Sequence, residues 1–167
     1  MPAVVRICLL RHAEAVDERR DLYDGARYLS AAGRQAAVIA GRQLAGYWRD
    51  AAGAGLIAAD ALGFVASPLV RAMQTAELAA ATFGPDCDVV CEPMLAPGND
   101  IVELAAKLRT RATQLVVIAV GHEPGLSALG AELTGDVNFP MLDKGDAVLI
   151  ENGKLQWCWQ VGAARPR

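Results

Sequence analysis

Short apolar runs alternate with amphipathic segments along this chain of 167 residues. The runs at 4–11, 62–66 and 115–120 are rich in Val, Ile and Leu, which is typical of parallel strands that are buried on both faces. A shorter run at 88–91 indicates a further strand. Strands that alternate with helical sequence favour a mostly parallel sheet with helices on both faces.

Apolar residues recur at helical spacing between these runs. Ser30 is a suitable N-cap for the first helix, which we expect to end near Trp48, before an Ala-Gly loop at 51–55. Pro68 ends the strand before the second helix. The expected helices cover 30–48, 69–81, 100–111 and 124–133.

The end of the chain predicts a β-hairpin. Two apolar segments, 147–151 and 154–159, flank the dipeptide Asn152-Gly153, which suits the positive φ angles of a type I′ turn. The predicted fold class is therefore α/β: a three-layer α/β/α sandwich with a mostly parallel central sheet and a C-terminal antiparallel hairpin.

Length and composition limit the class of protein. The length suits one domain, which we expect to cover 1–162, followed by a disordered tail at 163–167. Although 53% of the residues are hydrophobic, no run approaches the roughly 20 apolar residues of a membrane span, and no export signal precedes the first strand. We therefore expect a cytoplasmic protein without a membrane partner. The net charge of -3 gives no basic footprint for nucleic acid.

The four cysteines show no zinc-ligand spacing, and we interpret them as reduced side chains. The two histidines are more informative, because each directly follows a predicted strand. His12 follows the first run, beside Arg11, and His122 follows the run at 115–120. Since the carboxyl ends of parallel strands meet at one edge of a sheet, where ligands bind, we expect both imidazoles in one site. Taken singly, each residue is more often structural; together they indicate covalent phosphoryl chemistry.

Four motifs occur in a fixed order along the chain: Arg-His-Ala-Glu, Arg-x-Leu-Ser-x-x-Gly, Ser-Pro-x-x-Arg-Ala-x-Gln-Thr and Gly-His-x-Pro. This series resembles the histidine phosphatase superfamily, the phosphoglycerate mutase-like group. The short chain and the second motif are most similar to its SixA branch, the protein phosphohistidine phosphatases. The resemblance implies a phosphoglycerate mutase-like fold. The motifs lie at 11–14, 27–33, 67–75 and 121–124.

The resemblance also implies roles for individual residues. His12 is the expected nucleophile that carries the phosphoryl group, and Arg11 and Arg71 are the expected clamps for its oxygens, which guanidinium groups match in geometry. His122 is expected to donate a hydrogen bond to the phosphoryl group. Arg27 has two open interpretations, a contact to the phosphate or a surface role.

Two departures from the family pattern affect the interpretation. Ala13 replaces the usual glycine after the first histidine. In addition, no carboxylate stands in a convincing motif for a general acid, which is worth roughly 10²–10⁴ in rate for an alkoxide leaving group. Imidazole leaves more readily, so this pattern favours phosphoramidate substrates. We expect Glu14 to line the mouth and contact substrate, and the question of an acid stays open among Glu14, Glu92, Asp100 and Glu123.

These observations predict a phosphatase that needs neither a metal nor a cofactor and forms a phosphohistidine intermediate. The expected substrate is phosphohistidine on a signalling or phosphotransfer protein, a histidine-phosphotransfer domain or a phosphocarrier, and the expected state is a monomer or weak dimer. One alternative substrate is a small phosphate ester or phosphoanhydride; an alternative of another class is a non-catalytic phosphohistidine-binding module. Arg19 and Arg20 belong either to a positively charged mouth or to a solvated loop.

Overall fold

Strands and helices alternate as the sequence predicts. The structure, a computed structural model, describes residues 4–55, 62–113 and 116–167; residues 1–3 and Leu115, part of the predicted domain and strands, lie outside this description. The described strands form one sheet in the order β3-β2-β4-β1-β5-β6. Their bounds are β1 (Arg6–Arg11), β2 (Leu62–Ala66), β3 (Val89–Cys91), β4 (Val116–Gly121), β5 (Ala147–Glu151) and β6 (Lys154–Trp159).

The strand directions confirm the predicted sheet, which is mostly parallel with an antiparallel hairpin at the C-terminal end. Pairs β1–β4, β2–β4 and β2–β3 are parallel, whereas β5 runs antiparallel to β1 and β6 antiparallel to β5. The hairpin turns at Asn152 and Gly153, whose φ angles are 48° and 75°. Both residues therefore have the left-handed conformation that this dipeptide tolerates.

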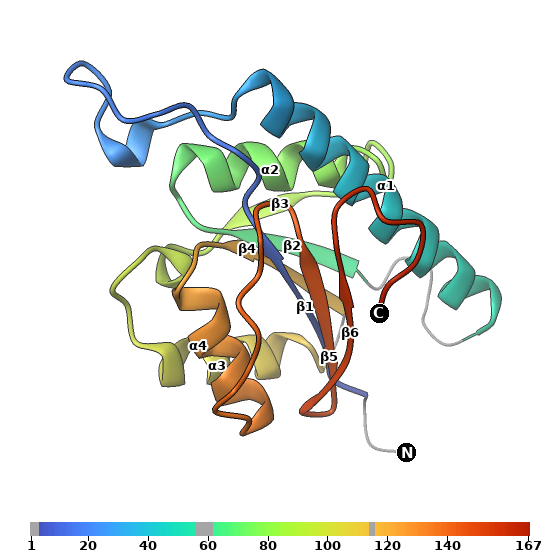
Figure 1. Cartoon of the computed structure of the whole chain (residues 1–167). Helices are drawn as coiled ribbons and strands as arrows, with labels where there is room; N and C mark the ends of the chain where they lie inside the picture. The colour runs from blue at the N-terminus through green and yellow to red at the C-terminus, as the bar shows by residue number, and fades with distance from the viewer. Residues whose placement is uncertain (1–3, 56–61, 114–115) are drawn as a thin grey trace.

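Helices cover both faces of the sheet (Figure 1). Cys8 and Leu10 of β1 pack in one apolar cluster with α1 and α2, while Ile7 and Leu9 pack in a second cluster with α3 and α4. Because successive residues of a strand point to opposite faces, an unbroken apolar run serves both clusters. The three-layer α/β/α architecture is confirmed. The helices are α1 (Ala31–Gly53), α2 (Val70–Ala80), α3 (Ile101–Arg111) and α4 (Gly125–Thr134).

Helix α1 differs from its prediction at one end only. Ser30 caps its start as expected, since the hydroxyl accepts a hydrogen bond from the Gly33 N–H at 3.0 Å. The helix continues past Trp48 to Gly53, so the predicted loop at 51–55 is wrong in its first part. Alanine has the highest helix propensity, and Ala51 packs in the core, which stabilises the additional turn.

The last residues also differ from expectation, because the structure gives residues 163–167 defined partners. The backbone of Arg167 exchanges two hydrogen bonds with Cys158 of β6, at 2.8 and 2.9 Å. The indole N–H of Trp159 donates to the Ala163 carbonyl at 2.9 Å. As β6 lies at the edge of the sheet, its outward backbone groups are available for this pairing.

No helix in the described ranges is long and apolar enough to cross a membrane.

Candidate active site

The four parallel strands end at the same edge of the sheet, and a polar residue follows each of them: His12, Ser67, Glu92 and His122. The strand register pairs Arg11 with Gly121. The rings of His12 and His122 consequently lie with their centroids 5.0 Å apart, tilted by 53°. This confirms the prediction that both histidines meet at one edge.

His12 has the protonation state of a nucleophile. Its side chain is 8% exposed, and Nδ1 lies 2.7 Å from the carbonyl oxygen of Ala13. Because a carbonyl only accepts, this contact places the proton on Nδ1 and leaves the Nε2 lone pair free. Burial lowers the pKa of His12 to about 4. The hydrogen bond to Ala13 acts in the opposite direction, whereas the positive charges of Arg71 and Arg11 lower the pKa further. The ring is therefore neutral at neutral pH.

The turn after His12 is fixed by α2. The Ala13 N–H donates to Thr75 Oγ1 at 3.1 Å, and this hydroxyl donates to the Arg71 carbonyl at 2.7 Å. Gln74 accepts a hydrogen bond from the Leu29 N–H at 2.8 Å. Both side chains of the Gln-Thr pair thus hold backbone segments in place.

Arg71 lies in the first turn of α2 and is 7% exposed. Its Nη1 donates to the Asp24 carbonyl at 2.7 Å and its Nη2 to Asp24 Oδ2 at 3.1 Å. These contacts use two of the five N–H donors of a guanidinium group, so three are left for an anion. Asp24 also accepts from Arg27 Nη1 at 3.1 Å, which joins both arginines through one carboxylate.

The sequence analysis missed Asp24. Partial burial raises the pKa of this carboxyl, but the hydrogen bonds and charges of Arg71 and Arg27 outweigh that effect, and the pKa lies below its usual value. Asp24 is therefore ionised. The only sequence signal was an acidic residue three positions before Arg27, in a loop whose conformation the pattern did not predict.

Arg11 reaches the site from the end of β1. Its Nη1 donates to the Leu142 carbonyl at 2.7 Å, and its backbone N–H donates to Asp146 at 3.0 Å. The segment before β5 thus covers this arginine. Lys144 belongs to the same segment, and its charge contributes to the low pKa of His12. Lys144 is a second residue near the site that no motif indicated.

His122 is 5% exposed, and its Nε2 lies 2.8 Å from the Ser67 hydroxyl. Burial lowers the pKa of His122 to about 3, and the charges of His12 and Arg71 add to this effect. If Ser67 donates to Nε2, the neutral ring carries its proton on Nδ1. The motif at 67–75 includes Ser67 but gave it no role, so its contact with His122 is a further feature that sequence reasoning missed.

Two buried nitrogens of this site, His122 Nδ1 and Arg11 Nε, have no hydrogen-bond partner within the described ranges. Buried polar groups are usually satisfied, and exceptions require an explanation. Both nitrogens belong to residues that were expected to bind a phosphoryl group. An anion between the strand ends is a suitable partner for such donors.

The four carboxylates that were candidates for a general acid each have a structural partner. Glu92 is 5% exposed and lies 2.7 Å from Lys107 Nζ. Asp100 caps α3. Glu123 accepts hydrogen bonds from the backbone N–H groups of Leu142 and Ser127 and from the Ser127 hydroxyl. Glu14 is exposed and accepts a hydrogen bond from the Ser30 hydroxyl at 2.8 Å. In the parts of the chain that the structure describes, no group of three or more His, Cys, Asp and Glu side chains forms a metal-binding cluster.

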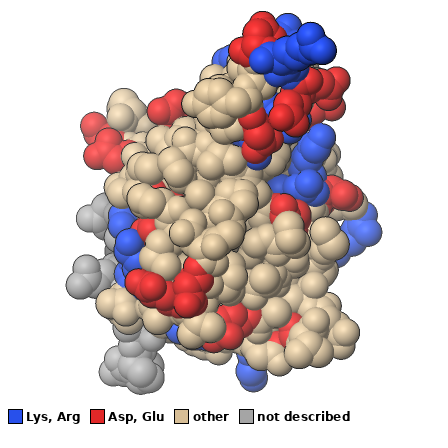
Figure 2. All heavy atoms as spheres, turned by 90° about the vertical axis from the view of Figure 1, so that its left-hand side faces the viewer, with Lys and Arg blue, Asp and Glu red and all other residues tan. Residues whose placement is uncertain are grey.

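Arg19 and Arg20 lie on an arm, residues 16–28, which projects beside the site at the upper left of Figure 1. Figure 2 shows acidic and basic side chains mixed at the tip of this arm, above a face whose middle is largely uncharged. Arg19 forms an exposed ion pair with Asp21, at 3.6 Å. This contact favours the solvated-loop interpretation for Arg19, whereas Arg27, from the same arm, contacts Asp24.

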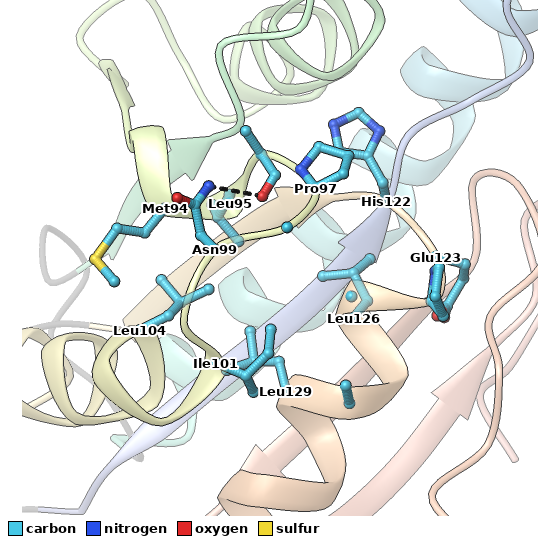
Figure 3. A pocket seen from close by; sticks show the side chains of 15 residues that line it. Met94, Leu95, Pro97, Asn99, Ile101, Leu104, His122, Glu123, Leu126 and Leu129 are labelled. Carbon is cyan, nitrogen blue, oxygen red and sulfur yellow. Dashed lines mark hydrogen bonds between the residues drawn. The ribbon is translucent and has the colours of Figure 1, made fainter.

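An apolar pocket of about 290 Å³ adjoins His122 (Figure 3). It lies between the loop 93–99 and the starts of α3 and α4. Most of its walls are hydrocarbon; the main apolar side chains are Leu95, Pro97, Ile101, Leu104, Leu126 and Leu129. No motif of the sequence indicated this pocket.

The fold and the strand-end histidines define an α/β protein with a polar site at one edge of its parallel strands, and a family comparison makes the assignment specific. The model of the histidine phosphatase superfamily (branch 1) matches residues 7–96, more than half of the chain. The protein belongs to this superfamily. His122 and the apolar pocket's α4 wall lie beyond the matched residues.

Solved structures show the same fold. The protein histidine phosphatase SixA complexed with tungstate is 19% identical to this chain, with a TM-score of 0.74. The match covers 92% of this chain and 95% of that chain. A SixA-type protein from Agrobacterium tumefaciens is also 19% identical, with a TM-score of 0.73 and coverage of 96% and 99%. A mycobacterial glucosyl-3-phosphoglycerate phosphatase is 19% identical, with a TM-score of 0.61 and coverage of 89% and 90%. A search of curated proteins found no match.

Proposed function

We propose that this protein is a phosphohistidine phosphatase that acts through a covalent intermediate on His12. The observation that carries the proposal is the state of His12: a buried, neutral imidazole whose Nδ1 contacts the Ala13 carbonyl at 2.7 Å, so that Nε2 is a free lone pair. Membership of the histidine phosphatase superfamily supports a phosphatase. The SixA structure holds tungstate, an oxyanion with the shape of phosphate.

The proposed reaction has two displacements at phosphorus. His12 Nε2 attacks the phosphoryl group and forms a P–N bond, while the P–N bond to the substrate imidazole breaks and that imidazole takes up a proton from solvent. Water then attacks phosphorus and gives up a proton to solvent, the bond to His12 breaks so that the ring returns to its neutral form with the proton on Nδ1, and inorganic phosphate leaves. In both steps Arg11, Arg71 and His122 hold the equatorial oxygens, where negative charge is spread in the transition state.

The carboxylates support a leaving group that departs readily. Glu14, Glu92, Asp100 and Glu123 all have partners that hold them in structural roles. An alkoxide would gain roughly 10²–10⁴ in rate from a free acid. The imidazole of phosphohistidine depends less on such help, so we propose a phosphorylated protein, a histidine-phosphotransfer domain or phosphocarrier, as substrate.

Trapping of the phosphoenzyme tests the mechanism. We expect rapid quenching with ³²P-labelled phosphohistidine protein to give a label on the enzyme that is labile in acid and stable in base. The label and turnover should both disappear in His12→Ala, while Arg19→Ala, which changes an exposed residue of the arm, retains them. Full turnover by His12→Ala would refute the covalent mechanism.

A small phosphate ester is the second candidate substrate, favoured by the apolar pocket beside His122. Values of kcat/KM for a phosphohistidine domain and for a panel of alkyl, aryl and sugar phosphates separate the two candidates. A higher kcat/KM for any ester than for the phosphohistidine domain would identify that ester as the substrate. Stoichiometric binding of the phosphohistidine domain without phosphate release would instead identify a binding module.

A further inference from the structure

The pocket beside His122 is chemically different from the phosphate site that it adjoins. His122 belongs to both, since the centroid of its ring lies 5.0 Å from that of His12 and the residue also lines the pocket (Figure 3). A substrate held at phosphorus by the histidines therefore has its nearby atoms within reach of the pocket. What enters it must be a part of the substrate close to the phosphoryl group.

Away from His122, the polar side chains of the pocket wall, Asn99 and Glu123, already have hydrogen-bond partners. The Asn99 amide nitrogen donates to the carbonyls of Pro93 and Ala96, at 3.1 and 2.9 Å. Glu123 accepts hydrogen bonds at both of its oxygens, from Leu142 and Ser127. A sugar or a nucleobase would bury hydroxyl or amide groups here without partners, which costs about 1–3 kcal/mol for each group. The pocket therefore suits a hydrocarbon group.

The size and the position of the pocket indicate where this hydrocarbon comes from. A volume of about 290 Å³ is just below the range of roughly 300–1,000 Å³ that is usual for small-molecule sites, and it is ample for one side chain. Since the pocket shares His122 with the phosphate site, the hydrocarbon that fits it lies close to the phosphoryl group, as a side chain beside a phosphohistidine does.

We propose that this pocket holds one apolar side chain of the phosphorylated partner protein, next to its phosphohistidine, and thereby selects the partner. The proposal rests on the proposed function. Burial of one leucine side chain stabilises a complex enough to raise kcat/KM about tenfold or more. The phosphate site then recognises the modification, whereas the pocket recognises its sequence context.

The test uses the full chain and a set of phosphohistidine peptides. Each peptide carries one leucine, placed in turn at each position near the phosphohistidine in an otherwise constant polar sequence; phosphoimidazole, which lacks any context, is the reference substrate. We expect one position at which leucine raises kcat/KM about tenfold over alanine. Equal rates for all peptides would refute the proposal and leave the phosphatase assignment intact.

A variant pair locates the effect. Ala128 is an exposed residue of α4 that lines the pocket, and Ala106 is an exposed residue of α3 that does not. In Ala128→Phe the added ring fills the pocket, so the preference for leucine should fall to about onefold, and in Ala106→Phe it should stay near tenfold. Ala128→Glu, which brings a charge to the same wall, should also abolish the preference.

Melting temperatures establish that each variant is folded. A leucine preference that survives in folded Ala128→Phe and Ala128→Glu would place the side chain elsewhere and refute the proposal. Failure of the proposed function looks different: neither the peptides nor phosphoimidazole would be hydrolysed. If an aryl phosphate ester were then hydrolysed and its rate fell in Ala128→Phe, the occupant would be a small ester and the proposed partner side chain would be wrong.

Discussion

The two walls of the site differ in how they are built. The phosphate wall, formed by His12, Arg11, Arg71 and the arm, consists of polar groups joined to backbone atoms and to each other. The apolar wall, formed by the loop 93–99 and the start of α4, has its polar groups turned to their own backbone. The first geometry is required by a phosphoryl group. The geometry of the apolar wall can differ with the part of the substrate that carries the phosphoryl group.

The largest effect should come from the phosphate wall. We expect Arg71→Ala to lower kcat/KM by about 10³-fold, because it removes a charged donor to the transition state and leaves Asp24 with Arg27 as its remaining ion-pair partner. Arg71→Lys should recover only part of the loss, since an ammonium group lacks the fork. The loss should be the same for every substrate, which steady-state kinetics on phosphoimidazole and on a phosphohistidine peptide will show. A loss of kcat/KM that is confined to peptides would show that the two walls do not differ in this way.

One glycine on each wall compares their packing. A Cβ at Gly33 would lie 1.9 Å from the Glu14 carbonyl oxygen, whereas a Cβ at Gly125 would meet no atom within 4 Å. We expect Gly33→Ala to destabilise the fold by about 3 kcal/mol, because backbone has to move, and Gly125→Ala to change stability by less than about 1 kcal/mol. Urea unfolding of both variants measures the difference. Equal stabilities would show that the close approach at Gly33 is readily relaxed.

Thr75 tests the link between α2 and the nucleophile. Thr75→Val keeps the shape but leaves the Ala13 N–H without its acceptor, which should cost about 1–3 kcal/mol of stability. Thr75→Ser retains the hydroxyl and should lose less. Since Ala13 also holds the His12 ring, kcat should fall more than KM rises in the valine variant. Unchanged kcat in a destabilised Thr75→Val would restrict this residue to folding.

A further comparison concerns pH. The pKa values of His12 and His122 lie at about 4 and about 3 in the fold, below the ordinary value of 6.5, because both rings are buried. From pH 6.5 downward the unfolded chain therefore takes up protons that the folded chain does not, so stability falls with decreasing pH and is independent of these groups above pH 6.5. Unfolding free energies between pH 7 and pH 4 test this, and His122→Gln should reduce the slope. The acid limb of kcat/KM should lie near pH 4, and a limb near 6.5 would contradict a neutral buried nucleophile.

The phosphate wall was largely predictable because its residues lie at strand ends and in the first turn of a helix. The buried runs before His12 and His122 determine the strands, and parallel strands must end at one edge. Asp24 and Ser67 were missed because their contacts depend on the path of a loop and on a hydroxyl orientation, neither of which has a period in sequence. The apolar pocket was missed for the same reason: Pro97 and Leu129 meet only after the loop 93–99 has folded against α4.

The pairing of Arg167 with Cys158 has a consequence for how molecules of this protein meet each other. An edge strand exposes unpaired backbone groups that can recruit a strand from a second molecule. At one edge of the sheet β3 has only three residues, and at the other the C-terminal segment occupies the outward groups of Cys158. The short β3 limits strand addition at one border, and Arg167 blocks the other at Cys158; a chain shortened at Ala163 would free the backbone groups of Cys158.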